Sequence, residues 1–501
     1  MADPYYITTA ISYPNGAPHI GHAYEAIAAD TIARFQRAQG RDVRFQTGTD
    51  EHGLKMAQAA RAEGADPQEY ADKMSSRFKE MCDSLDVAYD RFIRTSEPAH
   101  HRASQAIWQA MEANGDLYLG RYEGWYSVRD EAFYDASELT GEGDDRRSPQ
   151  GTPVEWTVEE SWFFKLSAYQ QPLLDHYAAQ PEFIQPDTRR NEVLRFVEGG
   201  LNDLSISRTS FDWGIKVPGN AKHVMYVWLD ALTNYLTGLG YPDGGDLLDR
   251  YWPANVHLIG KDVVRFHAVY WPAFLMSAKI ALPRQIYGHG FLLSRGEKMS
   301  KSVGNVVDPF VLAERFGVDA LRYFLLREVT FGQDGSYSAE AIVNRVNAEL
   351  ANSFGNLAQR SLSMVHKNLD GVVPAPGEAT EDAALLATVR TACRQTLPAE
   401  FEKFAFAQGL EAWMAAVFAC NAYVDTMAPW ALKKSDPMRM AAVLGTLVAA
   451  IRELAVAVAP VVPTSAAKLI ALIDSAEGGQ PIAAPTPIFP RLEHVEAEDA
   501  A

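Results

Sequence analysis

Cysteine is scarce in this chain of 501 residues, and the three that occur, Cys82, Cys393 and Cys420, lie far apart. This spacing offers neither a disulfide framework nor a cysteine-based metal site, and it is typical of a reducing compartment. An excess of basic residues is also absent, because the formal net charge is -18. That charge argues against a generally basic, adhesive protein, although nucleic acid can still bind at a local patch.

No hydrophobic run has the pattern of a membrane span. The most apolar stretch, around residues 443 to 463, is interrupted by Arg452 and Glu453 and ends in prolines, which predicts a packed helix. The first residues show no basic segment followed by a long apolar one, so we expect no secretory signal. We find no internal repeat. These absences predict a soluble cytoplasmic protein without membrane attachment, and the length predicts two to four domains.

What the chain does contain, at its start, is the pattern of a β-α-β unit. A β-rich segment at 5–13 leads through a Pro-Asn-Gly loop into apolar residues at helical spacing. A second strand at 43–47 is followed by Gly48-Thr49-Asp50. Ligands of open α/β sheets bind beyond the carboxyl ends of the strands, where both the first loop and Asp50 fall.

Two histidines, His19 and His22, occupy a predicted helix start in that first loop. Three residues apart, they can face one ligand, and the exposed N–H groups of a helix N-terminus attract phosphate. Gly21 would let a base or a phosphate approach the backbone closely. From these residues alone a plain helix cap stays open, as does a metal site, which would lack a nearby carboxylate or cysteine.

A second motif, Gly-Glu-Lys-Met-Ser-Lys-Ser, spans residues 296–302 between Gly290 and Gly304. The flanking glycines allow a mobile loop, and Lys298 and Lys301 could neutralise a departing pyrophosphate. Alone, the motif would indicate a solvated surface loop. After His-Ile-Gly-His, and in an α/β context, it resembles the signature pair of class I aminoacyl-tRNA synthetases.

Within that class, the chain most resembles the methionyl-tRNA synthetases, from Tyr6 to about residue 475. The matching stretches are Ala-Ile-Ser-Tyr at 10–13, Gly-Thr-Asp-Glu-His-Gly at 48–53, Tyr-Val-Trp-Leu-Asp-Ala at 226–231, Ile-Gly-Lys-Asp at 259–262 and Phe-His at 266–267. The family's methionine pocket carries over onto Ile11, Tyr13, Asp50, Trp228, Ala231, Tyr235 and His267. Its ATP site carries over onto His19, Gly21, His22, Gly260, Asp262, Lys298, Met299, Ser300 and Lys301.

Independent physical arguments fit this pocket. Trp228, Ala231 and Tyr235 lie at i, i+3 and i+7, so they share one helix face. Aromatic rings suit a polarizable thioether, and Asp50 can hold the substrate ammonium through a charge-assisted hydrogen bond. Without the resemblance, the aromatic stripe could equally be core, and Asp50 a strand-end cap.

The resemblance implies ATP-dependent activation of L-methionine to methionyl-adenylate, with Mg²⁺ accompanying ATP. The methionyl group then passes to the 3′-terminal adenosine of tRNA(Met), initiator and elongator alike. No side-chain nucleophile is needed, because positioning and charge stabilisation carry the rate. The catalytic residues implied are His19, His22, Lys298 and Lys301.

The resemblance also implies anticodon recognition by Asn356, Arg360 and Trp430. An Asn and an Arg supply hydrogen bonds to base edges, and a Trp supplies a stacking plane for unstacked bases. Packing within a helical bundle remains the alternative for each of the three residues.

The implied fold is α/β, a Rossmann-like catalytic domain with a parallel sheet, an inserted connective domain and a C-terminal α-helical bundle. We expect the two halves of the catalytic domain at 1–115 and 226–340, the second including the Lys-Met-Ser-Lys-Ser and stem-contact region. The connective insertion is expected at 116–225, the anticodon-binding bundle at 341–475 and a tail with a short strand at 476–501. No further C-terminal module follows, so family analogy favours a monomer.

Many relatives carry a zinc knuckle in the insertion, and this chain departs from that pattern. The four ligand positions map onto Ser127, Asp130, Arg147 and Gln150, so we expect no structural zinc. We hypothesise that Asp130 and Arg147 form an ion pair that holds the knuckle together. Two unrelated surface charges are the alternative.

Three other functions were weighed against this one. A synthetase for isoleucine, valine or leucine would need a larger editing insertion than residues 116–225 allow. A small nucleotidylyltransferase would not need the long helical C-terminal part. A tRNA-binding protein without catalysis would have no reason to retain both signature motifs and the pocket.

Overall fold

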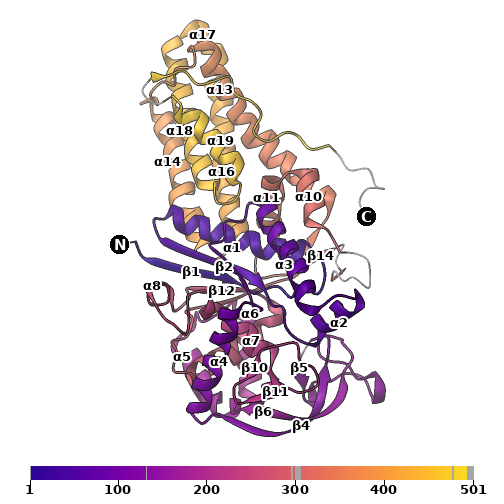
Figure 1. The fold of residues 1–501 in the computed structure, drawn as a ribbon. Coiled ribbons are helices and arrows are strands. Elements are labelled where there is room, and N and C mark those ends of the chain that lie inside the picture. The colour runs from indigo at the N-terminus through magenta and orange to yellow at the C-terminus, as the bar shows by residue number, and fades with distance from the viewer. Residues whose placement is uncertain (1, 131, 295–296, 299–305, 477–478, 494–501) are drawn as a thin grey trace. The chain divides into compact units, whose positions relative to one another are not determined.

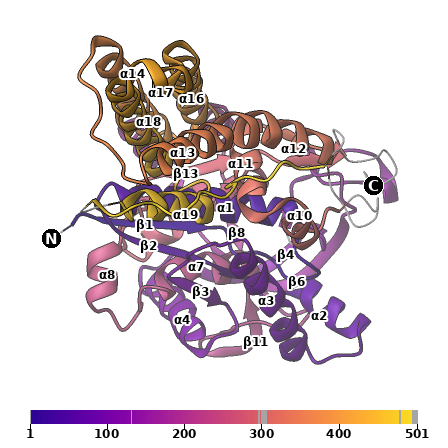
Figure 2. The same cartoon turned by 90° about the horizontal axis from the view of Figure 1, so that it is seen from above.

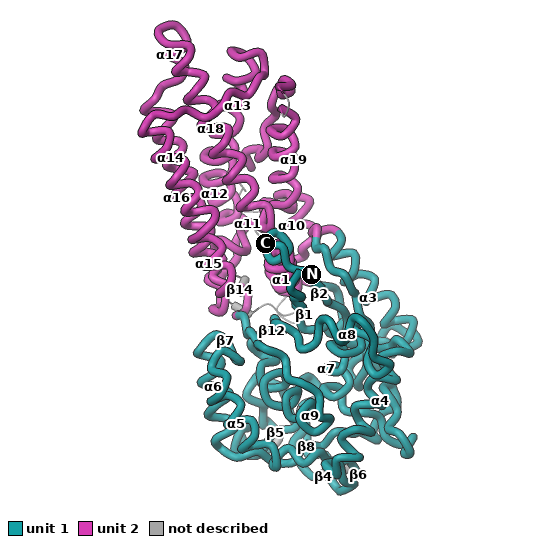
Figure 3. The backbone as a smooth tube through the Cα atoms, turned by 90° about the vertical axis from the view of Figure 1, so that its left-hand side faces the viewer, with its two compact units in different colours: residues 1–18, 36–83, 87–289 teal, residues 19–35, 84–86, 290–501 magenta. Residues whose placement is uncertain are grey.

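The computed structural model describes residues 2–130, 132–294, 297–298, 306–476 and 479–493. They form two compact units that are interleaved along the chain (Figure 3). Unit 1 comprises residues 1–18, 36–83 and 87–289, and unit 2 comprises residues 19–35, 84–86 and 290–501.

A six-stranded parallel sheet forms the core of unit 1, in the order β3-β2-β1-β12-β13-β7. The strands are β1 (Pro4–Thr9), β2 (Asp42–Thr49), β3 (Arg91–Arg94), β7 (Ile184–Gln185), β12 (Val256–Gly260) and β13 (Ile286–His289). From β1 the order runs through β2 and β3 on one side and through β12 and β13 on the other, where β7 forms the edge. A topological switch point therefore lies between β1 and β12, where α/β sheets bind ligands. The Rossmann-like sheet is therefore confirmed.

The first strand is shorter than the predicted 5–13. β1 ends at Thr9, and Ser12 forms only an isolated bridge to Thr49. The helices associated with unit 1 are α2 (Leu54–Ala62), α3 (Pro67–Ser84), α4 (Pro98–Ala113), α5 (Gln170–Ala179), α6 (Asp187–Glu198), α7 (Val227–Thr237), α8 (Asp246–Tyr251) and α9 (Trp271–Ser277). Almost every residue of α7 is buried, including the polar side chains of Asp230, Thr233, Asn234 and Thr237.

Two further antiparallel sheets fall within 116–225, the segment expected to form the insertion. One has the order β5-β4-β6-β8 and consists of β4 (Leu117–Ser127), β5 (Ala132–Tyr134), β6 (Glu155–Phe164) and β8 (Leu204–Ser205). The other has the order β10-β11-β9 and consists of β9 (Ser207–Arg208), β10 (Lys216–Val217) and β11 (Asn220–Met225). The same segment also supplies β7 to the main sheet, so part of it is continuous with that sheet.

Unit 2 is mainly helical. Figures 1 and 2 show α18 lying among α13, α14, α16 and α17, as the predicted bundle requires. Its helices are α10 (Pro309–Phe316), α11 (Val318–Glu328), α12 (Ala339–Arg345), α13 (Asn356–Asn368), α14 (Thr380–Thr391), α15 (Leu397–Phe401), α16 (Phe406–Met427), α17 (Pro429–Ser435), α18 (Pro437–Val458) and α19 (Pro463–Asp474). A small sheet pairs β14 (Leu292–Ser294) with β15 (Glu297–Lys298) and β16 (Gly335–Tyr337).

A buried arginine explains why residues 19–35 and 84–86 belong to unit 2. The side chain of Arg322 is fully buried on α11 and forms an ion pair with Asp30, which lies on helix α1 (Ile20–Ala38). Its guanidinium also donates to the backbone carbonyls of Leu85, Asp86, Pro460 and Val461. A buried guanidinium needs such partners for its charge and its N–H groups, so these segments are held together.

Helix α18 is long and apolar enough to cross a membrane by length and composition, and most of its apolar window is buried within the protein. The packed helix predicted around 443–463 is therefore confirmed. Described residues 479–493 contain no strand, so the predicted terminal strand does not form in that part of the tail. Four prolines between 481 and 490 remove the N–H groups that a ladder needs.

Candidate functional site

The carboxyl edge of the parallel sheet brings the first residues of the predicted methionine pocket together. β1 leads into residues 11–13, and β2 ends directly before Asp50. The Ser12 N–H donates to the Gly48 carbonyl, and the Asp50 N–H donates to the Ser12 carbonyl, both at 2.9 Å. Ile11 and Tyr13 therefore flank the residue that pairs with Asp50, which is itself buried.

Helix α7 and the segment from 266 to 270 supply aromatic residues to this region. The Trp228 ring stacks on that of Phe266, with centroids 3.8 Å apart and an angle of 8° between the planes. The Tyr235 hydroxyl lies 2.7 Å from Nε2 of His267. Phe266 was not predicted as a site residue, although it stands in a matched stretch beside His267.

The protonation of His267 follows from its neighbours. Its Nδ1 atom lies 2.9 Å from the Val263 carbonyl, which can only accept, so Nδ1 carries the hydrogen. Nε2 is then an acceptor, and the Tyr235 hydroxyl is the donor between them. Burial lowers the pKa of His267 to about 4, so its imidazole is neutral at pH 7.

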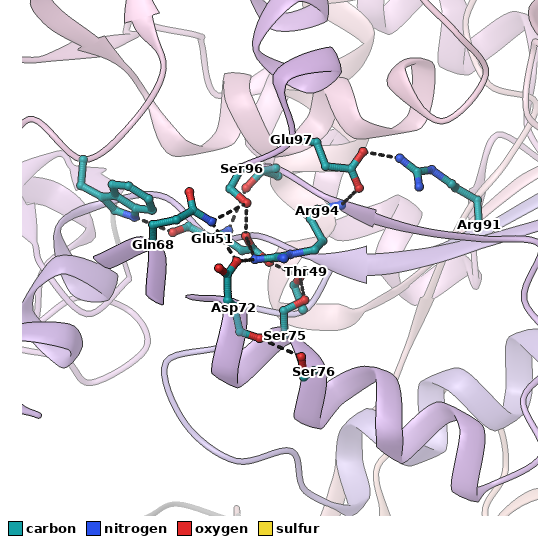
Figure 4. A network of polar contacts seen from close by, with 12 residues as sticks. Thr49, Glu51, Gln68, Asp72, Ser75, Ser76, Arg91, Arg94, Ser96 and Glu97 are labelled. Atoms are coloured by element: carbon teal, nitrogen blue, oxygen red, sulfur yellow. Dashed lines mark hydrogen bonds and ion pairs between the residues drawn. The ribbon is translucent and has the colours of Figure 1, made fainter. Parts of the chain in front are cut away.

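A buried polar network holds the turn that contains Asp50 (Figure 4). The Glu51 carboxylate has no exposed surface and accepts two hydrogen bonds from the Arg94 guanidinium, at 2.7 and 3.0 Å. The hydroxyls of Thr49 and Ser96 donate to the same carboxylate. With so many fixed partners, the backbone on either side of Glu51 has little freedom. Neither Glu51 nor Arg94 was predicted as a site residue.

The predicted nucleoside residues follow the neighbouring strand. Gly260 ends β12, and Asp262 is exposed in the short 3-10 turn Lys261–Val263. A Cβ atom at position 260 would lie 2.7 Å from Oδ1 of Asp262, so a larger residue would displace that carboxylate. Because that carboxylate is the exposed end of a flexible side chain, a small movement of Asp262 would relieve the contact.

In unit 2, the two histidines of the first motif cap helix α1 reciprocally. Nδ1 of His19 accepts from the Gly21 N–H at 3.0 Å, and Nδ1 of His22 accepts from the His19 N–H at 3.1 Å. The two imidazoles therefore cap the helix as a capping box does, and their predicted role toward phosphate stays a prediction. Because Nδ1 accepts, each neutral ring carries its hydrogen on Nε2, which makes Nε2 a donor suited to a phosphate oxygen.

Most of the second motif lies outside the described residues. Gly296, Met299, Ser300 and Lys301 are among the residues not described, and Lys298 is described only as part of strand β15, which pairs with β14. The predicted roles of these residues therefore stay predictions.

The predicted anticodon residues lie on the helical bundle of unit 2. Asn356 is exposed at the start of α13, and Arg360 lies one turn later, where its guanidinium donates to Oδ1 of Asn421 on α16 at 3.2 Å. α16 ends at Met427, Ala428 follows in a left-handed conformation, and α17 begins at Pro429. Trp430 follows with 54% of its surface exposed, so packing does not account for this tryptophan.

Comparison with known proteins shows which family has this arrangement. A family model described as class I tRNA synthetases (M) matches residues 5–362. A second model, described as the anticodon binding domain of methionyl tRNA ligase, matches residues 373–491. The chain belongs to the methionyl-tRNA synthetase family. The alternatives of a branched-chain amino acid synthetase and of a small nucleotidylyltransferase are therefore wrong.

Relatives match this methionyl-tRNA synthetase chain over nearly its whole length. The methionine--tRNA ligase of Brucella suis is 57% identical, over 99% of both chains. That of Mesorhizobium japonicum is 59% identical, over 94% of this chain and 91% of its own. The solved structure of Mycobacterium tuberculosis methionyl-tRNA synthetase in complex with methionyl-adenylate is 56% identical, with a TM-score of 0.94, and the match covers 98% of this chain and 100% of that one.

The knuckle of this synthetase is held by hydroxyl groups, and the predicted ion pair is wrong. The Asp130 carboxylate accepts from the hydroxyls of Ser148, at 2.7 Å, and of Thr152. Ser127 lies 2.7 Å from Thr152 and accepts from the Asp130 N–H. Arg147 is exposed and donates to the Gly151 carbonyl instead. Asp130 is drawn inward because buried hydroxyls surround its carboxylate, whereas Arg147 keeps its charge in water.

Among the residues that the structure describes, no group of three His, Cys, Asp or Glu side chains could hold a metal ion.

Proposed function

We propose that this chain activates L-methionine with ATP to methionyl-adenylate and transfers the methionyl group to the 3′-terminal adenosine of tRNA(Met). Initiator and elongator tRNA would both be substrates, so the product would serve the start and the elongation of protein synthesis. One observation carries the proposal. Asp50 follows β2 at the carboxyl edge of the sheet of unit 1, and the linked pair of Tyr235 and His267 stands in the same unit.

In this proposal each pocket residue meets a different part of methionine. The Asp50 carboxylate binds the ammonium group, because a buried carboxylate favours a cationic partner. Trp228, Ala231 and Tyr235 face the thioether side chain, and His267 holds the Tyr235 hydroxyl in place. Ile11 and Tyr13 complete the pocket from the segment that pairs with the Asp50 peptide.

The chemistry is an in-line attack of the methionine carboxylate on the α-phosphate of ATP, which releases pyrophosphate. His19 and His22 donate from Nε2 to phosphate oxygens, and Lys298 and Lys301 stabilise the transferring and departing charges. Gly21, Met299 and Ser300 contribute to the same phosphate site, and Gly260 and Asp262 bind the nucleoside. Mg²⁺ enters with ATP as part of the substrate.

The helical bundle would read the anticodon through Asn356, Arg360 and Trp430. The exposed Trp430 ring supports stacking, and Asn356 and Arg360 offer hydrogen-bond donors on one helix face. We keep the proposed division into 1–115, 116–225, 226–340, 341–475 and 476–501 as a functional division of the chain. A monomer in the cytoplasm fits this role.

ATP–pyrophosphate exchange with each amino acid in turn tests the proposal. Exchange with methionine, dependent on Mg²⁺ and unaffected when the protein has first been treated with a zinc chelator, is the expected result. Exchange with another aliphatic amino acid would contradict the pocket assignment. Loss of all exchange with retained tRNA binding would instead support a tRNA-binding protein without catalysis.

A further inference from the structure

Asp230 lies on α7 with its carboxylate between two imidazole rings. Oδ2 of Asp230 lies 2.7 Å from Nδ1 of His52, and Oδ1 lies 2.8 Å from Nε2 of His100. Asp230 and His100 have no exposed surface, and His52 has 3% exposed. The three side chains thus form a buried hydrogen-bonded chain. None of the three was predicted as a site residue, and none has a role in the reaction proposed above.

One end of this chain is the ammonium-binding turn. His52 stands two residues after Asp50, and its backbone carbonyl accepts a hydrogen bond from the Tyr13 hydroxyl at 2.7 Å. His52 is therefore fixed twice, by its carbonyl to a pocket residue and by its ring to Asp230. Any movement of His52 would be passed to Asp50 through only one intervening residue, Glu51, which is itself held by Arg94.

The other end is the helix that faces the thioether. Asp230 stands between Trp228 and Ala231 in the sequence of α7, and Tyr235 follows five residues later. His100, on α4, holds the second carboxylate oxygen and is itself 2.9 Å from the Thr237 hydroxyl at the end of α7. The carboxylate therefore links α7 to the turn after β2 and to α4.

We propose that Asp230 is a positioning residue for methionine, which sets the separation between the Asp50 carboxylate and the aromatic face of α7. Both of its carboxylate oxygens are engaged by the imidazoles of His52 and His100, so it acts through these neighbours and not on the substrate itself. The inference rests on the proposed function, since it concerns how the two walls of the methionine pocket are held in register. An amino acid is bound at both its ammonium and its side chain, so an error in that separation weakens both contacts at once.

The energetics favour a dedicated role over accidental burial. Burying a carboxylate away from water is costly unless the carboxylate is paired and hydrogen-bonded. Burial alone would raise the pKa of Asp230, but the contacts with His52 and His100 hold it well below its usual range. The carboxylate therefore stays charged, and both of its oxygens are anchored in fixed directions.

Two substitutions test this positioning role. Asp230→Asn keeps the shape of the side chain and removes its charge. His52→Asn is the conservative variant, because its amide nitrogen falls at the place of Nδ1, whereas His52→Gln places the amide further out. We expect Asp230→Asn and His52→Gln to raise the methionine KM in pyrophosphate exchange roughly tenfold, as loss of other residues that orient a binding group does. The ATP KM should stay within about twofold of wild type. His52→Asn should retain most of the affinity.

Asp382→Asn is the matched control. Asp382 is another fully buried carboxylate, on α14 of the helical bundle, where it pairs with Arg439 and accepts from Tyr423. Its substitution should lower the melting temperature without changing the methionine KM. A calorimetric titration of methionine alone gives a second readout that does not depend on catalysis.

The results that would overturn the inference are distinct. A folded Asp230→Asn protein with an unchanged methionine KM would do so, as would an equal rise in the KM of methionine and ATP. If Asp230→Asn does not fold, equal methionine affinity of the two His52 variants would do the same. Absence of methionine exchange in the wild-type enzyme would instead refute the proposed function.

Discussion

The Tyr235 hydroxyl donates to Nε2 of His267 across 2.7 Å, from helix α7 to the segment at 266–270, and both side chains are buried. The opposite nitrogen of the imidazole is fixed by the Val263 carbonyl. The tyrosine ring is held further by stacking on His257, with centroids 4.0 Å apart. The orientation of one pocket wall is thus set by the tautomer of a neutral histidine.

Tyr235→Phe should therefore weaken methionine binding without affecting ATP. It removes one hydrogen bond and leaves Nε2 of His267 buried without a donor, which costs about 1–3 kcal/mol. If this whole cost falls on methionine binding, pyrophosphate exchange should show a methionine KM roughly 5- to 150-fold higher. Tyr423→Phe, in the helical bundle, is the control for loss of a buried tyrosine hydroxyl and should leave that KM unchanged. A normal methionine KM for Tyr235→Phe would place the thioether elsewhere.

The buried His267 should make folding stability depend on pH. Burial lowers the pKa of His267 to about 4 in the folded protein, whereas in the unfolded chain this pKa is 6.5. Between these values the unfolded state binds more protons, so the free energy of unfolding falls as the pH falls from 6.5 to 4, by up to about 3 kcal/mol. Urea unfolding at pH 7 and pH 5 measures this loss. His267→Gln should reduce the difference between the two pH values, and an unchanged difference would contradict the assignment.

Anticodon recognition should be separable from methionine activation. Trp430→Ala removes a stacking plane worth about 1–3 kcal/mol per base, so charging of tRNA(Met) at limiting tRNA should fall roughly 5- to 150-fold. Arg360→Ala should lower charging as well, and neither variant should alter pyrophosphate exchange. Arg394→Gln is the control, because Arg394 is an exposed arginine on the same bundle that pairs with Glu453. Equal charging by wild type and both test variants would place the anticodon on another surface.

The knuckle should depend on Asp130 rather than on a metal. Asp130→Ala leaves the hydroxyls of Ser148 and Thr152 without their acceptor, at a cost of about 1–3 kcal/mol. We expect a protease to cut the Asp130→Ala protein faster than wild type within residues 127–153. Arg147→Ala removes only an exposed side chain, so this variant should be cut at the wild-type rate. Stoichiometric zinc in the purified protein by elemental analysis would contradict this account.

Local patterns were enough to predict part of this fold and site. The spacing of Trp228, Ala231 and Tyr235 predicts one helix face, and they do lie on helix α7. The position of Asp50 after a strand predicted its place at the carboxyl edge of the sheet. Both predictions rest on periodicity or on neighbouring residues, and these can be read from one sequence alone.

Contacts between distant residues could not be predicted in this way. His52 and Asp230 are 178 positions apart, and Glu51 and Arg94 are 43 apart, so no spacing rule connects them. The predicted ion pair in the knuckle was wrong for another reason. Opposite charges at Asp130 and Arg147 suggested an ion pair, but the nearby Ser148 and Thr152 hydroxyls satisfy the carboxylate better than an exposed guanidinium does.

The central claim is that methionine is bound between Asp50 and the aromatic face of α7. A crystal structure of the protein with L-methionine tests it most directly. The account predicts an ammonium nitrogen about 2.8 Å from the Asp50 carboxylate, with the thioether against Trp228 and Tyr235. Methionine bound with its ammonium away from Asp50, or at another place on the protein, would contradict it.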